Sequence, residues 1–144
     1  MRFAISPHPI DTANLREDLD DTRAGGVVCF EGCVRDFNDG RSVQRLEYEA
    51  FAPLAEKEGM RILGEAMERF GVLEIVCVHR VGILELGEVA VWVGVASRHR
   101  GAAFDACRYV IDEVKARVPI WKKEHYTEGD SGWINCHQES PPVR

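Results

Sequence analysis

The segment 115–124, KARVPIWKKE, gathers three lysines and an arginine around a proline and a tryptophan in a chain that is acidic overall. Clustered lysines stabilise developing negative charge, and a partly shielded lysine can move protons or attack a carbonyl carbon. Lys115 lies at the edge of the apolar face of an expected helix, and Lys122 follows the turn at Pro119. We expect both side chains to be partly exposed and to face one cavity. For Lys115, spacing alone favours the alternative of a surface lysine whose stem lies along apolar surface while its ammonium stays in water.

The charge of the chain limits what it can bind. Its 144 residues contain 18 Lys and Arg against 24 Asp and Glu, which gives a net charge of -6. This balance argues against a general nucleic-acid or membrane-surface binder, because such proteins depend on a positive field. Residues 98–123 differ from the rest, with seven basic and three acidic side chains. We therefore expect an anion to be bound locally, within that segment.

A second cationic group, Arg98 to Arg100, stands where the same helix is expected to begin. The first turn of a helix carries unpaired N–H groups and a partial positive charge, so cations there are unfavourable unless an anion offsets them. A bound phosphate would do so, with His99 and Arg100 as its ligands. Contact with carboxylates or with solvent explains the same residues equally well. Arg35, at the end of an expected strand, is a candidate to complete such an anion site.

The order of the expected elements indicates an α+β domain, in which helices pack on a mostly antiparallel sheet. The apolar runs 25–35, 42–51, 72–82 and 87–97 read as strands, the last two joined by a turn in 84–88. Helices are expected at 11–19, at 53–70 with Gly71 as C-cap, and at about 102–117 with Pro119 beyond the end. The apolar face of this last helix contains Ala103, Phe104, Cys107, Val110, Ile111, Val114 and Val118.

The chain ends and the cysteines add further expectations. Residues 1–137 read as one domain, and 138–144 as a mobile polar tail. The start resembles no signal peptide and no run approaches the ~18 apolar residues of a membrane span, which predicts a cytoplasmic protein. Five cysteines without an export signal indicate reduced thiols, most of them small buried hydrophobes. Cys29 and Cys33 stand about 13 Å apart along a strand, so we expect no metal site.

Four blocks carry a resemblance to a known family. They are FEGCVRD, HRVGILELGEVAVWVGVASRHRGAAFDA, DEVKARVPIWKKE and EGDSGWI, and they occur in order between Phe3 and Trp133. Together they resemble the large, catalytic subunit of molybdopterin synthase. The resemblance implies an α/β hammerhead fold and a central homodimer. It also implies a small ubiquitin-like subunit at each end, which makes a heterotetramer with two copies of each chain.

The same resemblance implies the reaction. The C-terminal Gly-Gly thiocarboxylate of the small subunit enters a pocket of the large subunit and supplies sulfur. A sulfurtransferase reaction then converts cyclic pyranopterin monophosphate into the dithiolene of molybdopterin, with no resident cofactor. Two rival functions stay open: a non-catalytic anion- or nucleotide-binding module, and a cysteine-based sulfur carrier.

The resemblance also implies roles for individual residues. The essential lysines of the family correspond to Lys115 and Lys122, and its anion-binding residues to Arg35, His99 and Arg100. His137 is the candidate for a basic side chain that the family often carries in its tail. Residues implied to line the substrate site are Cys33, Val34, Lys123 and Glu124, and candidates for the groove that receives the partner tail are Phe30, Ile111 and Trp121.

Overall fold

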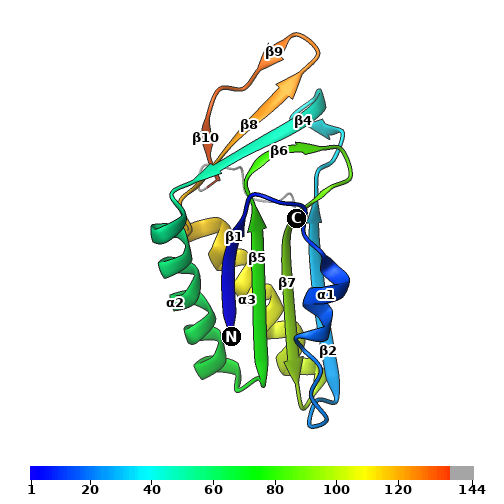
Figure 1. The fold of residues 1–144 in the computed structure, drawn as a ribbon, viewed down its shortest axis with the longest axis vertical. Helices are drawn as coiled ribbons and strands as arrows, with labels where there is room; N and C mark the ends of the chain where they lie inside the picture. Colours follow the sequence, from blue (N-terminus) through cyan, green and yellow to red (C-terminus); the bar gives the residue numbers. More distant parts are fainter. Residues whose placement is uncertain (137–144) are drawn as a thin grey trace.

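A four-stranded sheet forms the long body of the molecule (Figure 1). The computed structural model describes residues 1–136, so His137 and the tail 138–144 lie outside the described residues. The strand order is β1 (Arg2–Ser6), β5 (Glu74–Arg80), β7 (Val89–Ser97), β2 (Gly26–Cys33). The pair β1 and β5 is parallel, and the other pairs are antiparallel. The expected α+β class is confirmed.

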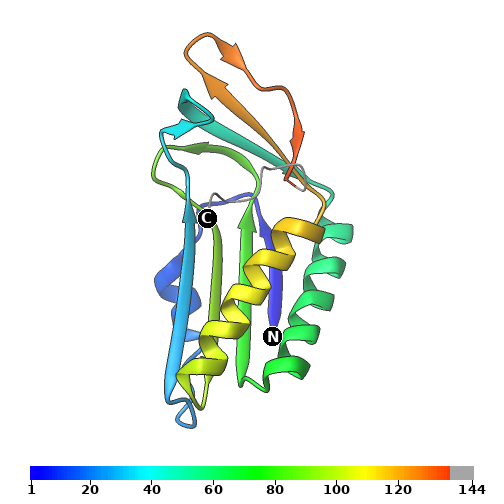
Figure 2. The same ribbon diagram turned by 180° about the vertical axis from the view of Figure 1, so that it is seen from behind.

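A second sheet lies crosswise over one end of the first sheet (Figures 1 and 2). Its longest pair is β4 (Arg41–Ala50) with β8 (Ile120–Tyr126), which are antiparallel. This arrangement agrees with the hammerhead shape that the resemblance implies. The shorter strands of the second sheet are β3 (Phe37–Asn38), β6 (Gly82–Glu85), β9 (Gly129–Asp130) and β10 (Ile134–Asn135).

Helices cover both faces of the four-stranded sheet. On one face lie α2 (Ala52–Phe70) and α3 (Arg100–Arg117), and on the other lies the short α1 (Thr12–Glu17) (Figure 2). Alternation along β5 sends Ile75 and Cys77 toward the two long helices, while Val76 and Val78 pack with Leu15, Leu19 and Trp92 beneath α1. Because both faces are covered, β5 and β7 are nearly continuous apolar runs.

Local sequence signals set most of the element ends. Asp11 caps α1 by accepting a hydrogen bond from the Asn14 backbone N–H at 3.1 Å. Pro53 lies in the first turn of α2, and Gly71 ends that helix with φ of 62°, a left-handed conformation that glycine adopts without a Cβ clash. Pro119 lies two residues after Arg117, the last residue of α3, with Val118 as the C-cap between them. The expected ends of α2, at Gly71, and of α3, before Pro119, are therefore confirmed, whereas α1 is shorter than the expected 11–19.

Two segments differ from expectation. Residues 82–85, expected only to lead into a turn, form β6 and pair with β4. Residues 120–126, for which only the preceding turn at Pro119 was expected, form β8. Both are half-polar strands whose partner lies far along the chain, so local apolar pattern did not reveal them. The strands therefore divide into two sheets.

The buried face of α3 also differs at one position. Phe104, expected to pack on the sheet, is 60% exposed, whereas Ala106 is fully buried. Ala103 and Ala106 are small enough to bring the helix axis close to β7 and β2, and the large ring of Phe104 lies outside that contact. None of the helices in residues 1–136 combines the length and apolar character needed to cross a bilayer.

A cluster of charged side chains joins α2 to α3 at their surface. Arg117 donates hydrogen bonds to Glu58 Oε1 at 2.8 and 3.0 Å and to both oxygens of Glu65 at 2.6 and 2.8 Å. Tyr109 also donates to Glu65, at 2.7 Å. The hydrogen bonds from Arg117 and Tyr109 lower the pKa of Glu65 from 4.5 to about 2.

We predict that Arg117→Met lowers the free energy of unfolding at pH 7 by about 1 kcal/mol, a modest value because the cluster is about one-third exposed. The depressed pKa of Glu65 means that its contribution is present above pH 4.5 and is lost as the pH falls toward 2. The difference between variant and wild type should therefore shrink between pH 6 and pH 3 in urea titrations. A difference that does not change with pH would contradict this account.

Candidate active site

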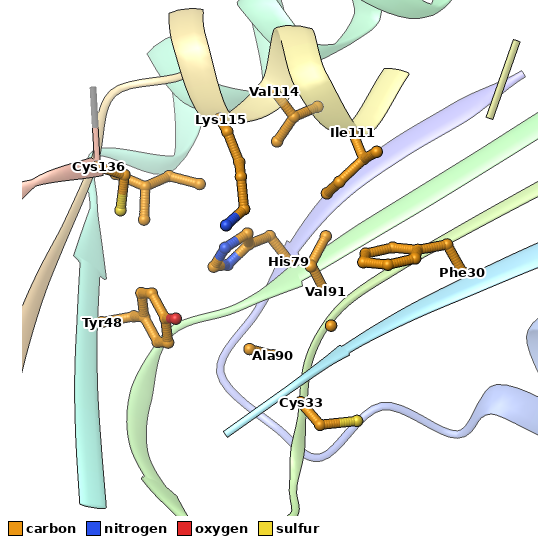
Figure 3. A pocket seen from close by; sticks show the side chains of 12 residues that line it. Phe30, Cys33, Tyr48, His79, Ala90, Val91, Ile111, Val114, Lys115 and Cys136 are labelled. Carbon is orange, nitrogen blue, oxygen red and sulfur yellow. The ribbon is translucent and has the colours of Figure 1, made fainter. Parts of the chain in front are cut away.

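Two pockets meet at Lys115, where the two sheets and the end of α3 come together (Figure 3). The first, which we call the apolar pocket, has a volume of about 110 Å³. The second, the polar pocket, has a volume of about 300 Å³. Lys115, Cys33 and Tyr48 line both. The apolar pocket is otherwise lined by Phe30, Gly32, His79, Ala90, Val91, Ile111, Val114, Ile120 and Cys136, and the polar pocket by Arg35, Asn38, Val43, Leu46, Lys122 and Glu124.

The reversal of the chain after α3 brings the two candidate lysines together. Lys115 lies in the last turn of α3, and Pro119 prevents the helix from continuing. The chain then returns as β8, in which alternate side chains point to opposite faces. Lys122 and Glu124 point into the polar pocket. The expectation that Lys115 and Lys122 face one cavity is confirmed.

A buried carboxylate organises the polar pocket. Glu124 is 2% exposed and forms an ion pair with Lys122, with 3.4 Å between Nζ and Oε1. Asn38 Nδ2 donates to the same carboxylate at 2.7 Å, and the Tyr126 hydroxyl donates to it at 2.6 Å. Arg35 Nη2 in turn donates to Asn38 Oδ1 at 3.1 Å. Two hydrogen bonds and one ion pair therefore link Arg35, Asn38, Glu124 and Lys122 in series.

The pocket that results is cationic in spite of the carboxylate. Arg35, Lys115 and Lys122 supply three positive groups, against the one negative charge of Glu124. Glu124 also raises the pKa of Tyr126 to about 12, mainly through the hydrogen bond, so the phenol stays protonated and acts as a donor. Such an arrangement can bind an anion and stabilise negative charge that develops during a reaction.

Three residues expected at the site lie elsewhere in the structure. Val34 is 3% exposed and packs with Leu84 and Ala90, because its side chain points into the core where β2 ends. Trp121 and Lys123 lie on the face of β8 opposite to Lys122, as strand alternation requires. Trp121 is 42% exposed, and the Lys123 amino group lies 4.5 Å from the ring centre of Trp133.

His99 and Arg100 lie at the opposite end of α3 from Lys115. Fifteen residues separate Arg100 from Lys115, which corresponds to about 22 Å along an α-helix. Both residues are exposed, and no side chain caps the helix at His99. Arg35 lies at the polar pocket with Lys122 and not at the start of α3. One chain therefore does not bring all the expected anion-binding residues together.

Other expected residues do meet at the pockets. Phe30 and Ile111 line the apolar pocket, and with Phe104 and Lys115 they also line an open groove of about 540 Å³ between α3 and β2. Sequence reasoning missed Asn38, Tyr126, Tyr48 and His79. For Tyr126 a signal existed, since it stands two residues after Glu124 and a strand places such residues on one face. Asn38 lies in the turn-rich DFNDGR, where polar residues are common in any loop.

The cysteines differ in burial. Cys77 and Cys107 are buried, as expected, and burial raises the pKa of both thiols, that of Cys107 to about 11. Cys29 and Cys33 are exposed on β2, and Cys136, which was expected to be a small buried residue, is only partly buried. Burial of part of its surface also raises the pKa of Cys29. Within residues 1–136, no cluster of three or more His, Cys, Asp or Glu side chains is arranged to hold a metal ion.

Comparison with known proteins assigns the chain to a family. The family model described as MoaE protein matches residues 5–117. This chain belongs to the MoaE protein family. A molybdopterin synthase catalytic subunit from Pseudomonas aeruginosa is 50% identical to it over 122 residues, which cover 83% of this chain and 81% of that protein.

Solved structures extend the comparison to the MoaE fold. The crystal structure of molybdopterin synthase from Staphylococcus aureus matches with a TM-score of 0.88 and 38% identity, covering 94% of this chain and 98% of that one. A protein-protein complex of subunits 1 and 2 of molybdopterin-converting factor from Helicobacter pylori contains a chain of the same fold, with a TM-score of 0.75 and 21% identity. It covers 98% of this chain and 94% of that one.

The burial of Lys122 in this MoaE family member separates the two lysines. Lys122 is 9% exposed, contrary to expectation, whereas Lys115 is exposed as expected. We predict that Lys122→Ala lowers the free energy of unfolding by about 1–3 kcal/mol, because it leaves the buried Glu124 carboxylate without its cation. The matched control, Lys115→Ala, should cost less than about 0.5 kcal/mol. Equal losses in urea unfolding would show that the Lys122–Glu124 pair does not stabilise the fold.

Proposed function

We propose that this chain is the catalytic subunit of a molybdopterin synthase and acts as a sulfurtransferase. In this proposal, sulfur passes from the C-terminal thiocarboxylate of a small ubiquitin-like partner to cyclic pyranopterin monophosphate, forming the dithiolene. The observation that carries the proposal is the position of Lys115 at the junction of an apolar and a polar pocket. Membership of the MoaE family supports it.

The two pockets differ in the way that two different reactants would require. The apolar pocket is narrow, and Phe30 and Ile111 line both it and the groove that leads to it. A Gly-Gly tail suits such a passage because glycine carries no side chain. The polar pocket is wider and cationic, which suits a cyclic phosphate. The thiocarboxylate and the pterin would then meet at Lys115.

Each cation of the polar pocket has a role in this proposal. Sulfur transfer from an acyl group passes through negatively charged intermediates, and Lys122, held by Glu124, would stabilise that charge. Lys115 would move protons or attack the acyl carbon of the tail, because it reaches both pockets. Arg35, held by Asn38, would bind the substrate anion. The chemistry uses no resident cofactor or metal, and the sulfur comes from the partner.

We further propose that a second copy of the chain supplies His99 and Arg100. These residues lie about 22 Å from Lys115 within one chain, too far for any side chain to cover. A homodimer, as the family resemblance implies, allows the start of α3 in one copy to lie at the polar pocket of the other. The substrate site would then be shared between copies, and each dimer would contain two such sites.

Two rival functions make different demands on the residues. A non-catalytic anion-binding module would use the same cations and would tolerate Lys115→Arg, since arginine keeps the charge. A cysteine-based sulfur carrier needs an accessible thiol with a low pKa, and the raised pKa values of Cys29, Cys77 and Cys107 argue against those three. Cys33 stays as the candidate for this rival, because it is exposed and lines both pockets.

The decisive experiment mixes the pure protein with a thiocarboxylated small partner and cyclic pyranopterin monophosphate. Mass spectrometry should detect a dithiolene product, and the partner should be left with a carboxylate end. Lys115→Ala and Lys115→Arg should each lower turnover by a factor of about 100 or more, because neither side chain can act as a neutral amine. Cys33→Ser is the matched control at the same pockets and should stay within about threefold of wild type. Product formation at the normal rate by folded Lys115→Ala protein would refute the proposal.

A shared site predicts complementation between two inactive variants. Lys115→Ala and Arg100→Ala each remove one half of every site in a homodimer. After unfolding and refolding together in equal amounts, half of the dimers should be mixed, and each mixed dimer should contain one intact site. Roughly a quarter of wild-type activity should therefore return, as two-fold symmetry requires. If the mixture stays as inactive as its components, His99 and Arg100 do not act in the site of a second copy.

A further inference from the structure

His79 is a buried titratable residue for which the family resemblance implies no role. It lies in β5, is 7% exposed, and lines the apolar pocket together with Lys115. Its ring meets the ring of Tyr48 edge to face, with 5.0 Å between the ring centres and an angle of 76° between the planes. A polar ring in an apolar pocket is costly unless its nitrogens have partners. The two nitrogens of His79 therefore need separate explanation.

The first ring nitrogen has a partner on its own strand. Nδ1 lies 2.7 Å from the backbone carbonyl oxygen of Arg80. A carbonyl oxygen only accepts, so Nδ1 carries the proton and donates it. Burial lowers the pKa of His79 to about 4, and the charge of Lys115 contributes to the shift, so the ring is neutral at pH 7. In this tautomer Nε2 has no proton and is an acceptor.

His79 lines the apolar pocket together with Lys115, while its Nδ1 contacts its own strand. Figure 3 shows the Lys115 side chain descending from α3 with its amino group directed toward the His79 imidazole. The His79 ring packs against Tyr48 and is hydrogen-bonded to the Arg80 carbonyl. Its orientation is therefore fixed by contacts that do not involve Lys115. A lysine side chain, in contrast, rotates about four bonds and needs an acceptor to hold its amino group in one place.

We propose that His79 is a positioning residue for Lys115: its Nε2 accepts a hydrogen bond from the Lys115 amino group and holds that group at the junction of the two pockets. This inference rests on the proposed function, because that function is the reason why the position of the Lys115 amino group matters. The proposed hydrogen bond itself involves only residues of this chain, so it can be tested without the partner. A neutral imidazole is suited to this task because it offers a lone pair without a negative charge. A carboxylate in its place would form an ion pair and oppose binding of the anionic reactants.

Two amide substitutions separate the roles of the ring nitrogens. His79→Gln places an amide near the position of Nε2 and keeps an acceptor in the pocket. His79→Asn places an amide near the position of Nδ1, keeps the bond to the Arg80 carbonyl and loses the pocket acceptor. His79→Leu fills most of the volume of the imidazole and removes both the bond to the Arg80 carbonyl and the acceptor in the pocket. If His79 positions Lys115, His79→Gln should behave like the wild type, whereas His79→Asn and His79→Leu should not. If His79 only fills space, this difference between the variants is not expected.

The test measures the reactivity of Lys115 in the isolated protein, where no sulfur transfer is needed. Each variant is treated with a trace of acetic anhydride at pH 8, and acetylation of Lys115 is compared by peptide mass spectrometry with that of Lys57, an exposed lysine on α2. The ratio should be unchanged in His79→Gln. It should rise roughly threefold or more in His79→Asn and His79→Leu, because the ammonium form loses an acceptor. Equal ratios in wild type, His79→Asn and His79→Leu would overturn the proposal.

Turnover supplies a second, separate measurement. With the thiocarboxylated partner and the cyclic pyranopterin, His79→Asn should lower kcat about tenfold with little change in KM, and His79→Gln should restore most of it. Thermal unfolding shows whether each variant folds. If His79→Asn does not fold, His79→Leu takes its place in the comparison with His79→Gln. A changed acetylation ratio in a protein that makes no dithiolene would uphold the contact and refute the function. Normal turnover in His79→Asn and His79→Leu would refute the positioning role and leave the function intact.

Discussion

The pairing of β4 with β8 holds the candidate site together. It places Tyr48 opposite Lys122 and Leu46 opposite Glu124, so these four side chains share one face of the second sheet. That face meets the end of α3, whose position is in turn set by Ala103 and Ala106 against the first sheet. The site is therefore a junction between two sheets, and its geometry depends on backbone hydrogen bonds more than on contacts among its own charged groups.

A buried acid in a pocket of cations needs a physical reason. Lys122 points into the molecule at 9% exposure, and a lone ammonium there would lose most of its hydration. Glu124 offsets that cost, and Asn38 and Tyr126 donate further hydrogen bonds to its carboxylate. The same hydrogen bonds extend through Asn38 to Arg35. One carboxylate thus keeps two cations in defined places, while the pocket as a whole stays positive.

Much of the fold could be predicted from the sequence because its signals are local. The apolar runs of β5 and β7, the caps at Asp11 and Gly71 and the stop at Pro119 each depend on a few neighbouring residues. β6 and β8 could not be predicted in this way, because half of each is polar and β4 lies far away in the sequence. The contact between Asn38 and Glu124 joins residues 86 apart and leaves no periodic pattern. The family resemblance named the four charged residues of the two pockets, Arg35, Lys115, Lys122 and Glu124. It also named Trp121 and Lys123, although strand alternation alone predicts that these two side chains point away from the face of Lys122.

The separation of His99 and Arg100 from Lys115 bears on how residues are assigned to a site. A family resemblance identifies which side chains act on a substrate, but it does not say that one chain supplies them all. Because α3 is a continuous helix whose inner face is packed on the first sheet, the distance of about 22 Å between its ends cannot close by bending or by rotation of side chains. A movement large enough to join the two ends would expose the core beneath Ala103, Val110 and Val114. Bringing a second copy alongside leaves that core intact, and for this reason a shared site is physically simpler than a mobile one.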